Sequence, residues 1–476
     1  MNNTVHASEK GYLLVLILVY GSIFFVILSS IFSYIVTQSR LADTKYAREQ
    51  ALDIAEAGLN YYRWFLAHNP GDATNGTGIP GPYVHDYFDP EGAKIGEFSL
   101  DIASSTSCGD VYAIDITSSG YTMDNPTNIR TVYGRYAQPT VAEYSYIINS
   151  NVWAGSDRQI IGPYHSNGVI RMDGTNFSTV TSGQETWVCD GSISCSPTTT
   201  GGTVAGVYGD GVNDHLWSYP SPPINFTGLT IDLSAMQAKA QTGGGRYIAP
   251  SGSYGYRLVF NSNGTFSVYR VTGTYNYGGY TTENGWQWER HVIQNQTFVA
   301  TYTVPSACSL IYVEDKVWLE GTVNGKVSIA AADVDTSGVN PSIILNGSIT
   351  YANATSGLLA IAEQDVLVGL VVPDTMSLNG IFIAQNGRFG RNHYSTSGTY
   401  DVESIHDSYV QQTNLTVNGT IVSNGREGTK WTSGGVFQSG FQNRTNSYDR
   451  DLVADPPPLT PEVSDTYRFI EWREVE

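Results

Sequence analysis

The hydrophobic and polar residues are distributed unevenly along the start of the chain. Residues 12–36 include no Asp, Glu, Lys, Arg or His. A helix of about 20 residues already crosses the apolar core of a bilayer. The pattern therefore predicts a transmembrane helix over residues 12–36. This apolar run is too long for a cleavable secretory signal, and no secretory cleavage site follows it.

The predicted helix continues beyond the apolar run. Residues 40–66 contain no Pro and a single Gly, so nothing stops the helix before Asn69-Pro70-Gly71. Residues 37–70 are expected to form an amphipathic extension, and the whole rod would be roughly 80 Å long. Apolar side chains recur there at spacings of three and four, which places on one face Leu52, Ala55, Leu59, Tyr62 and Leu66. This stripe is expected to pack on another element.

The rest of the chain has the pattern of a β protein. Three alternating runs, at residues 97–103, 111–118 and 128–136, are separated by Gly, Asn, Asp and Pro. They predict a small antiparallel sheet within residues 71–143, which would cover the apolar stripe of the helix. The aromatic-rich residues 467–474 are expected to form a docked strand that seals a sheet edge.

A short phrase recurs through the second half of the chain. An Asn-Gly pair followed by β-branched residues occurs at Asn167, Asn324, Asn346, Asn379 and Asn418. Each pair is expected to be a turn that leads into a short strand, because Asn-Gly readily takes φ > 0. The spacing favours a right-handed parallel β-helix, in which each coil stacks on the last. A hairpin meander or a sandwich is the alternative.

These elements divide the chain into segments. The predicted fold class is mainly β: a long N-terminal helix, a small antiparallel sheet, and a right-handed parallel β-helix-like ectodomain with an insertion. The β-helix is expected to start over residues 144–180 and to resume over 306–440. Residues 181–305, which include three closely spaced prolines, are expected to be the insertion, and residues 441–476 the C-terminal tail.

Composition agrees with a location outside the cytosol. Only 14% of the residues are charged, and the chain has 50 Gly and 32 Tyr, as in surface β proteins with many short strands. The formal net charge is −19, which disfavours nucleic acid as a partner.

The four cysteines form an even set in an oxidising compartment. Cys189 and Cys195 are close enough in sequence to close a short disulfide loop, and Cys108 with Cys308 is the remaining pairing. Only one close pair is present, so no zinc site is expected. No cofactor is expected either.

Catalytic motifs are not found. The chain has no Gly-x-Ser-x-Gly elbow and no His-Glu-x-x-His helix, and its eight histidines are scattered. The acidic pairs Asp333 with Asp335 and Asp210 with Asp214 are the candidates for carboxylate catalysis, or for calcium in the second case. Asp in such Gly-, Ser- and Asn-rich contexts usually makes local hydrogen bonds. We expect no enzymatic activity and no metal site.

A Gly-rich stretch carries the candidate ligand contacts. Its aromatic residues offer flat apolar area with polar tips, suited to sugars on a surface, and are Tyr275, Tyr277, Tyr280, Trp286 and Trp288. The alternative interpretation is that these side chains pack the insertion against the β-helix.

The N-terminus resembles a known family. The leader Ser8-Glu9-Lys10-Gly11, the apolar helix and the extension at residues 51–59 are similar to type IV pilin-like proteins, specifically the PilX N-terminal family of minor pilins. The resemblance implies a leader over residues 1–11, cleavage by a prepilin peptidase after Gly11, and Tyr12 as the new N-terminus. The helix would then pack in a filament core with other pilin-like subunits and the assembly machinery.

The resemblance also implies which residues pack in the filament. They are Leu16, Leu52, Ala55, Glu56, Leu59 and Tyr62. Most major pilins carry a glutamate at the fifth position after the cut, where this chain has Leu16, so the departure favours a minor or initiating subunit. The outer part is similar to uncharacterised surface proteins with the same N-terminus, through residues 313–325, 383–392 and 421–426.

Together these features predict a minor pilin-like component of a type IV pilus or a related filament. It would be a single-pass protein of the cell membrane with its ectodomain outside, displayed for adhesion to surface glycans. A signal-anchored adhesin or envelope structural protein is one alternative. A polysaccharide-active β-helix enzyme is the other.

Overall fold

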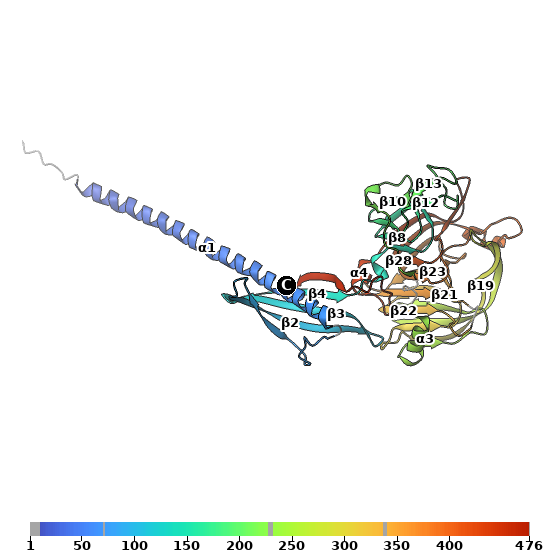
Figure 1. The fold of residues 1–476 in the computed structure, drawn as a ribbon, viewed down its shortest axis with the longest axis horizontal. Helices are drawn as coiled ribbons and strands as arrows, with labels where there is room; N and C mark the ends of the chain where they lie inside the picture. Colours follow the sequence, from blue (N-terminus) through green and yellow to red (C-terminus); the bar gives the residue numbers. More distant parts are fainter. Residues whose placement is uncertain (1–9, 70–71, 227–231, 337–339, 476) are drawn as a thin grey trace, which may run out of the picture. The chain divides into compact units, whose positions relative to one another are not determined.

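The computed structural model describes residues 10–69, 72–226, 232–336 and 340–475. The predicted leader, residues 1–11, falls mostly outside this part of the chain. Two compact units are present. The first comprises Met1–Ser104, Ile114–Tyr136 and Glu471–Glu476, and the second comprises Ser105–Ala113 and Ala137–Ile470. Their elements are labelled in Figure 1.

The first unit combines one long helix with one antiparallel sheet. Helix α1 is continuous over Lys10–His68, which confirms the predicted rod. It is long and apolar enough to cross a membrane, with a mean hydropathy of 2.6 in its most apolar window. The sheet has the strand order β1-β2-β3-β4-β31, with bounds Tyr83–Phe88, Lys94–Ser107, Asp110–Thr122, Asn125–Ala137 and Arg468–Val475. The three predicted strands are β2, β3 and β4, and the C-terminal strand β31 forms an edge.

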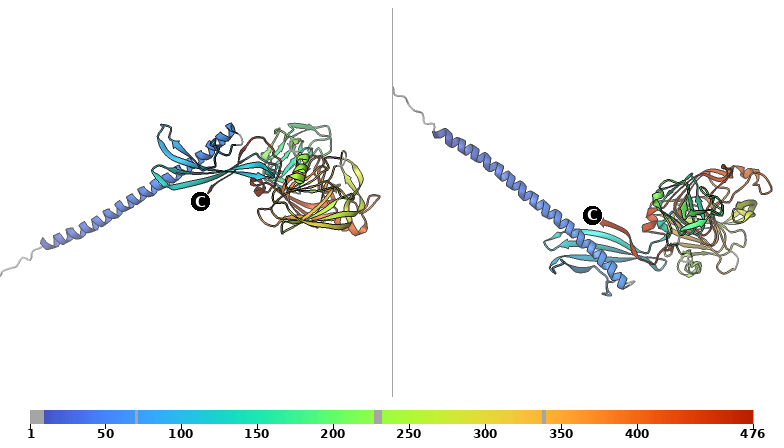
Figure 2. Two further views of the ribbon diagram at one scale, coloured as in Figure 1. Left: turned by 90° about the horizontal axis from the view of Figure 1, so that it is seen from below. Right: turned by 45° about the horizontal axis from the view of Figure 1, so that its top comes forward.

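Two further views show α1 lying along one face of this sheet (Figure 2). The side chains at the contact are buried and apolar, and they include Ile54, Leu59, Phe98, Leu100 and Ile116. The sheet thus covers the outer end of the helix, as the apolar stripe predicts. Residues earlier in α1 have no such cover.

The second unit is rich in short strands. Its strands between residues 146 and 218 are β5 Tyr146–Ile148, β6 Val152–Ala154, β7 Arg158–Ile161, β8 Tyr164–Ser166, β9 Ile170–Met172, β10 Thr175–Asn176, β11 Val180–Ser182, β12 Thr186–Val188, β13 Thr203–Ala205, β14 Val207–Tyr208 and β15 Trp217–Ser218. The middle strands are β16 Arg246–Ile248, β17 Tyr256–Asn261, β18 Thr265–Thr281, β19 Gly285–Thr303, β20 Leu310–Val313, β21 Val317–Val323 and β22 Lys326–Ala331.

The remaining strands are β23 Ile343–Tyr351, β24 Gly357–Ala362, β25 Val366–Val368, β26 Thr375–Ala384, β27 Phe389–Gly390, β28 Gln411–Ser423, β29 Lys430–Ser433 and β30 Val436–Ser447. Helices are few and short: η1 Val141–Glu143, η2 Asp214–Leu216, α3 Leu233–Thr242, η3 Ser404–Tyr409 and α4 Arg450–Ala454.

Most strands of the second unit pair in parallel, coil upon coil. The longest ladder runs β16, β20, β22, β24, β26, β28, β5, β8, β11, β15. A second ladder runs β17, β21, β23, β26, β28, β30, β7, β10. This is the pairing pattern of a parallel β-solenoid. Its right-handed winding stays a prediction.

The chain enters the solenoid in the middle of the stack. Strand β5, the first along the chain, pairs with β8 on one side and with the late strand β28 on the other. The stack therefore consists of two parts that meet at β5 and β28. One part is built from residues 146–218 and the other from residues 246–447.

The Asn-Gly phrases do not all form turns. Asn167-Gly168 and Asn324-Gly325 lie between strands, whereas the other three pairs lie inside β23, β26 and β28. Gly380 and Gly419 have φ of 146° and 141° and stack on each other in register. The expectation of five turns is wrong for these three pairs. At Gly380 and Gly419 the pairing continues through a corner of the solenoid, and glycine permits the bend.

The segment expected to be an insertion has two kinds of structure. Strands β15, β16 and β17 pair in parallel with solenoid strands. Strands β18 and β19 instead form a long antiparallel hairpin. Much of the solenoid interior is apolar, with fully buried side chains from successive coils such as Ile329, Ala360 and Phe382.

Candidate functional site

The first candidate surface is the N-terminal part of α1, residues 12–35. Its large apolar side chains from Tyr12 to Ile35 are exposed in the isolated chain. Leu16, predicted to pack in a filament, belongs to this exposed set, with 39% of its surface accessible. Apolar area of this extent on a helix is removed from water only by lipid or by other protein chains.

The C-terminal part of α1 is already covered by the sheet of the first unit. Ala55, Leu59 and Tyr62, also predicted to pack in a filament, are buried against the sheet of their own unit. Leu52 and Glu56 are half-buried. Tyr62 donates a hydrogen bond from its hydroxyl to the carbonyl oxygen of Asp72 at 2.7 Å, and burial raises its pKa. The apolar stripe thus packs against the sheet and stabilises the first unit.

Three glycines let α1 approach the sheet closely. A Cβ on Gly120 of β3 would lie 2.4 Å from the amide nitrogen of Ala55 and 2.6 Å from the carbonyl oxygen of Ala51. A Cβ on Gly58 would lie 2.2 Å from Oγ of Ser118, and one on Gly96 would lie 2.5 Å from Cδ1 of Ile54. At Gly120 the contact between helix and strand is therefore made backbone to backbone.

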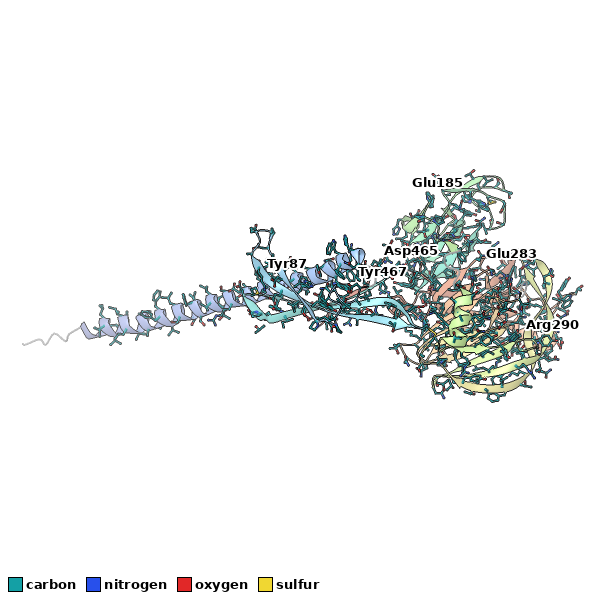
Figure 3. The ribbon with its side chains drawn as sticks, turned by 60° about the horizontal axis from the view of Figure 1, so that its bottom comes forward. Tyr87, Glu185, Glu283, Arg290, Asp465 and Tyr467 are labelled. Atoms are coloured by element: carbon teal, nitrogen blue, oxygen red, sulfur yellow. A yellow bond between two sulfur atoms is a disulfide. The ribbon has the colours of Figure 1, made fainter. Side chains whose placement is uncertain are left out.

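The second candidate surface is the aromatic cluster of the β18–β19 hairpin. Tyr280 and Trp286 face each other across the hairpin, with ring centroids 5.6 Å apart. Trp286 is stacked on Tyr400 at 5.3 Å with an interplanar angle of 7°, and Trp288 lies 5.2 Å from the same tyrosine. Figure 3 labels Glu283 and Arg290 near this end of the hairpin. The structure thus brings three of the five predicted aromatics together.

Residues from the solenoid complete this cluster. The backbones of Tyr280 and His393 exchange two hydrogen bonds, of 2.9 and 3.0 Å. The His393 ring lies 5.4 Å from Trp286 and 5.8 Å from Trp431. Burial lowers the pKa of His393. The sequence alone did not identify these partners, because residues 393, 400 and 431 lie far from the hairpin along the chain. Their aromatic or imidazole side chains were the only signal that could have suggested them.

The other two predicted aromatics belong to a neighbouring core. Tyr277 is buried, and its hydroxyl lies 2.7 Å from Nδ1 of His406. Tyr275 stacks on Tyr277 at 5.5 Å and packs against the same apolar cluster. Burial raises the pKa of Tyr277 to about 12. These contacts fit the packing interpretation, whereas Trp288 stays 53% exposed.

A buried carboxylate lies beneath the hairpin. Glu289 accepts a hydrogen bond from the Tyr394 hydroxyl at 2.5 Å and another from the Asn392 amide, and it lies 3.1 Å from Nδ1 of His291. Burial acts to raise the pKa of Glu289, but His291 and the hydrogen bonds from Tyr394 and Asn392 outweigh it and hold the pKa low. The carboxylate therefore anchors the hairpin to the solenoid.

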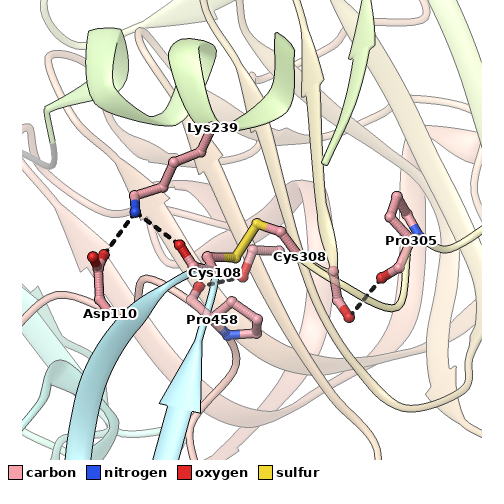
Figure 4. Close-up of a disulfide and its surroundings, with 8 residues drawn as sticks. Cys108, Asp110, Lys239, Pro305, Cys308 and Pro458 are labelled. Carbon is pink, nitrogen blue, oxygen red and sulfur yellow. Dashed lines mark hydrogen bonds and ion pairs between the residues drawn. A yellow bond between two sulfur atoms is a disulfide. The ribbon is translucent and has the colours of Figure 1, made fainter. Parts of the chain in front are cut away.

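The structure joins all four cysteines in two disulfides. Cys189 is bonded to Cys195, the pair favoured by sequence, and Cys108 is bonded to Cys308. Beside the second bond, Nζ of Lys239 donates to the carbonyl oxygen of Cys108 at 2.9 Å and pairs with Asp110 at 2.8 Å (Figure 4). This bond fixes two segments of the second unit that are 200 residues apart in sequence.

Asp333 makes a local hydrogen bond, whereas Asp335 bonds a side chain that is distant in sequence. Oδ1 of Asp333 accepts from the Thr336 amide at 2.9 Å, and Asp335 accepts from the Gln237 side chain at 2.9 Å. Asp214 opens the short helix η2, and the amide of Asp210 donates to Asp173. Within the described residues, no three His, Cys, Asp or Glu side chains are grouped so that they could hold a metal ion.

A buried ionic cluster joins the two parts of the solenoid. Nη1 of Arg158 lies 3.2 Å from Oε1 of Glu427, and both side chains are almost fully buried. Asp157 pairs with Arg444 at 2.9 Å and with Lys430 at 3.4 Å. Burial opposes the charge of Arg158, but the nearby Glu427 outweighs it and raises the pKa. No sequence signal marked these residues, since the partners are some 270 positions apart.

Comparisons with known proteins give one structural match to report. No family model matches the chain, and no curated protein matches it. Among solved structures, the chain is similar to the competence-associated pilin ComZ from Thermus thermophilus, with 12% sequence identity and a TM-score of 0.32. The alignment covers 90% of this chain and 98% of that chain. The function of the chain is therefore argued from its own residues.

Proposed function

We propose that the chain is a minor pilin-like subunit whose N-terminal helix first lies in the membrane and then packs among other helices in a filament. The observation that carries the proposal is the contrast along α1. Its outer part is buried by its own sheet, whereas its large apolar side chains from Tyr12 to Ile35 are exposed. A helix in an ordinary soluble domain would bury its most apolar segment.

Two further features support this function. The absence of charged residues over 12–36 suits both lipid and a helical filament core. The leader that ends at Gly11 would be removed by a prepilin peptidase, which would leave Tyr12 at the N-terminus. The partners are then pilin-like subunits and their assembly machinery. The ectodomain lies outside the cell in this proposal, and it acts without catalysis.

The test is mass spectrometry of the N-terminus of the full chain from a host that contains a prepilin peptidase. We expect a chain that starts at Tyr12 in this host and an intact leader in a matched host without the peptidase. An intact leader in both hosts would contradict the proposal. It would support the alternative of a signal-anchored adhesin or envelope protein, for which the same helix is a permanent anchor.

A second function, adhesion to surface glycans, is favoured by the exposed Trp288 next to the stacked pair Trp286 and Tyr400. Flat aromatic faces with polar neighbours are suited to the apolar faces of sugar rings. We propose that Trp288→Ala weakens binding to glycan-coated surfaces. Trp472→Ala removes an equally exposed tryptophan from β31 and is the matched control. Equal binding by both variants would contradict this role.

The polysaccharide-active enzyme remains the alternative from another class. It would need a pair of carboxylates that act on a bound sugar, and the candidates are Asp333 and Asp335. Asp333 accepts a local hydrogen bond from the Thr336 amide, and Asp335 accepts one from the Gln237 side chain, 98 positions earlier in the sequence. Turnover of a polysaccharide that falls in Asp333→Asn would favour this alternative over a non-enzymatic subunit.

A further inference from the structure

Asparagines of the second unit recur in one short sequence pattern. The pattern is Asn-x-Ser/Thr, in which x is any residue except Pro, and it marks the acceptors of N-linked glycans in exported proteins. We call it the acceptor pattern. A glycan is bulky and polar, so only an asparagine on the surface can carry one in the folded chain. The described asparagines of the second unit that begin this pattern are Asn176, Asn263, Asn295, Asn346, Asn353, Asn414, Asn418 and Asn443.

Two of these asparagines lie in turns between strands. Asn263 is in the turn that joins β17 to β18, and Asn353 is in the turn that joins β23 to β24. Both residues are exposed. An enzyme that reads the acceptor pattern has to reach the asparagine and the hydroxyl residue together, and a protruding turn presents both. The other asparagines of the described set lie within strands.

The two turns hold their asparagine in the same way. Oδ1 of Asn263 accepts from the amide of Thr265 at 3.2 Å and from its hydroxyl at 2.7 Å. Oδ1 of Asn353 accepts from the amide of Thr355 at 3.0 Å and from its hydroxyl at 2.8 Å. These bonds use only the carbonyl oxygen of each carboxamide. The Nδ2 group, which is the atom that carries an N-linked glycan, takes no part in them.

Both Nδ2 groups keep a hydrogen that a sugar can replace. Within the described part of the chain, Nδ2 of Asn263 makes no hydrogen bond. Nδ2 of Asn353 donates once, to Oδ1 of Asn324 at 3.1 Å. A carboxamide nitrogen carries two hydrogens, so this bond can persist when the second hydrogen is replaced.

The two sites belong to one column of stacked turns. Asn324 lies in the turn between β21 and β22, and its Nδ2 donates to the carbonyl oxygen of Ser262, which precedes Asn263. The strands before these turns, β17, β21 and β23, pair in parallel in that order. Two strand spacings therefore separate the sites, which is about 10 Å. Glycans at both sites would cover the same column.

The acceptor pattern inside other strands is bound into the fold. Thr420 is buried in β28 and donates from its hydroxyl to the carbonyl oxygen of Tyr144 at 2.7 Å. Oδ1 of Asn418 accepts from the Ser447 hydroxyl on β30 at 3.0 Å. Asn176 in β10 is only 1% exposed. A glycan on Asn418 or Asn176 would displace these contacts.

Two exposed asparagines of the set also lie in strands. They are Asn295 in β19 and Asn443 in β30. Side chains two positions apart along a strand are separated by ~7 Å, so the threonine of the pattern does not reach back to the carboxamide. Nδ2 of Asn443 donates instead to Oδ1 of Asn414 on β28, at 3.1 Å. The arrangement found in the two turns is therefore not reproduced at these positions.

We propose that Asn263 and Asn353 are acceptor sites for N-linked glycans. In the reaction, Nδ2 forms a bond to the anomeric carbon of a glycan that is carried on a polyprenyl-linked phosphate. The bond from that carbon to the phosphate oxygen breaks, and the lipid phosphate leaves with the electron pair. One Nδ2 proton passes to a base of the transferring enzyme. The inference requires export of the second unit, which the proposed function also requires, but it does not require filament assembly.

The experiment is peptide mapping by mass spectrometry of the full chain, purified from the organism that makes it. We expect a glycan mass on the peptides that contain Asn263 and Asn353. The internal controls are the strand positions Asn346 and Asn418, whose peptides are expected to be unmodified. Fragmentation that retains the glycan assigns it to one side chain. Unmodified peptides at both turn positions would overturn the proposal, and so would a glycan assigned to Thr355 or equal occupancy at the strand positions.

A pair of variants tests the acceptor pattern itself. Thr355→Ala removes the hydroxyl and should abolish the glycan at Asn353, whereas Asn263 stays occupied. Thr355→Ser keeps the hydroxyl and is the matched control, with both sites occupied. Thr355 is exposed, so both variants are expected to fold, and equal thermal unfolding verifies this. A glycan that persists at Asn353 in Thr355→Ala would contradict the proposal.

The same spectra separate this inference from the proposed function. A chain that carries both glycans and still has its leader would contradict processing as a pilin and leave the glycan sites intact. A chain that starts at Tyr12 without glycans would do the reverse.

Discussion

The molecule has two joints at which segments far apart in sequence meet, and they are built in opposite ways. In the first unit, α1 meets β3 through Gly58 and Gly120, where the absence of side chains allows close contact. In the second unit, the two parts of the solenoid meet with Arg158 and Glu427 buried between them. One joint removes side chains, and the other encloses charge.

The difference affects how each joint tolerates change. A joint between backbones is sensitive to any added atom, because neighbouring backbone cannot move aside as a side chain can. A buried ion pair tolerates replacement of both partners by apolar groups but not the loss of one, since the other is then left charged without a counter-ion.

The largest effect is expected at the solenoid joint. Glu427→Gln leaves the buried Arg158 without its carboxylate, and we expect the free energy of unfolding to fall by about 3–5 kcal/mol. Urea unfolding of the full chain in detergent measures this change. Glu471→Gln, which removes an exposed carboxylate paired with Arg473, is the control and should cost less than about 1 kcal/mol.

A double substitution distinguishes charge from packing at the same joint. In Arg158→Met/Glu427→Leu both charges are replaced by apolar side chains, and stability is expected to recover to near the unmodified value. A double variant as unstable as Glu427→Gln would show that the pair contributes shape or additional hydrogen bonds, such as the one from Arg158 to the Tyr146 hydroxyl.

An intermediate effect is expected at the helix joint. Gly120→Ala places a methyl group against the backbone of Ala51 and Ala55, and we expect a loss of about 1–3 kcal/mol in the first unit. Faster amide hydrogen exchange in residues 51–62 of α1 would report it. Gly21→Ala is the control, because no atom lies within 4 Å of its added Cβ. Equal exchange in the two variants would mean that the sheet can shift away from the helix.

The smallest effect concerns pH. Burial lowers the pKa of His165, on the β8 strand that stacks on β5, and that of His85, which packs on Tyr61 of α1. A folded-state pKa below the unfolded value of about 6.5 favours the neutral ring, so this stability is present above that pH and is lost as the pH falls.

Because His165 is the more deeply buried of the two, we expect the solenoid joint to weaken more than the helix joint between pH 7.5 and 5. Hydrogen exchange at both pH values, corrected for its intrinsic pH dependence, measures the two joints in one sample. In His165→Gln the acid sensitivity of the solenoid joint should shrink, and an unchanged sensitivity would assign the effect to other groups.

Periodicity predicted the helix joint because its signals are local. The apolar stripe recurs every three or four residues, and the alternating runs that form β2, β3 and β4 lie within about 80 positions of it. Parallel pairing in the solenoid was also predicted, from the spacing of the Asn-Gly phrases. Local pattern cannot predict the order of the coils, because nothing in the sequences of β5 and β28 indicates that these two strands pair with each other.

The candidate site was predictable only in part. The aromatic residues of the hairpin stand out in composition, and three of them gather as a cluster. Tyr400, His393 and Trp431 come from loops and strands with no repeated pattern, and the ion pair of Arg158 with Glu427 depends on a register that only the folded stack defines. Three of the five Asn-Gly pairs lie inside strands and not at the predicted turns, since a bend inside a strand uses the same residue types.

Entry into the middle of the stack has a consequence for biogenesis. A chain is synthesised from its N-terminus onward, so residues 146–218 are made before residues 411–447 exist. During that interval β5 and β7 lack the neighbours that β28 and β30 later supply. Contacts of such sequence separation form slowly. The second unit therefore completes its fold only after synthesis of nearly the whole chain, and its incomplete half has an open edge until then.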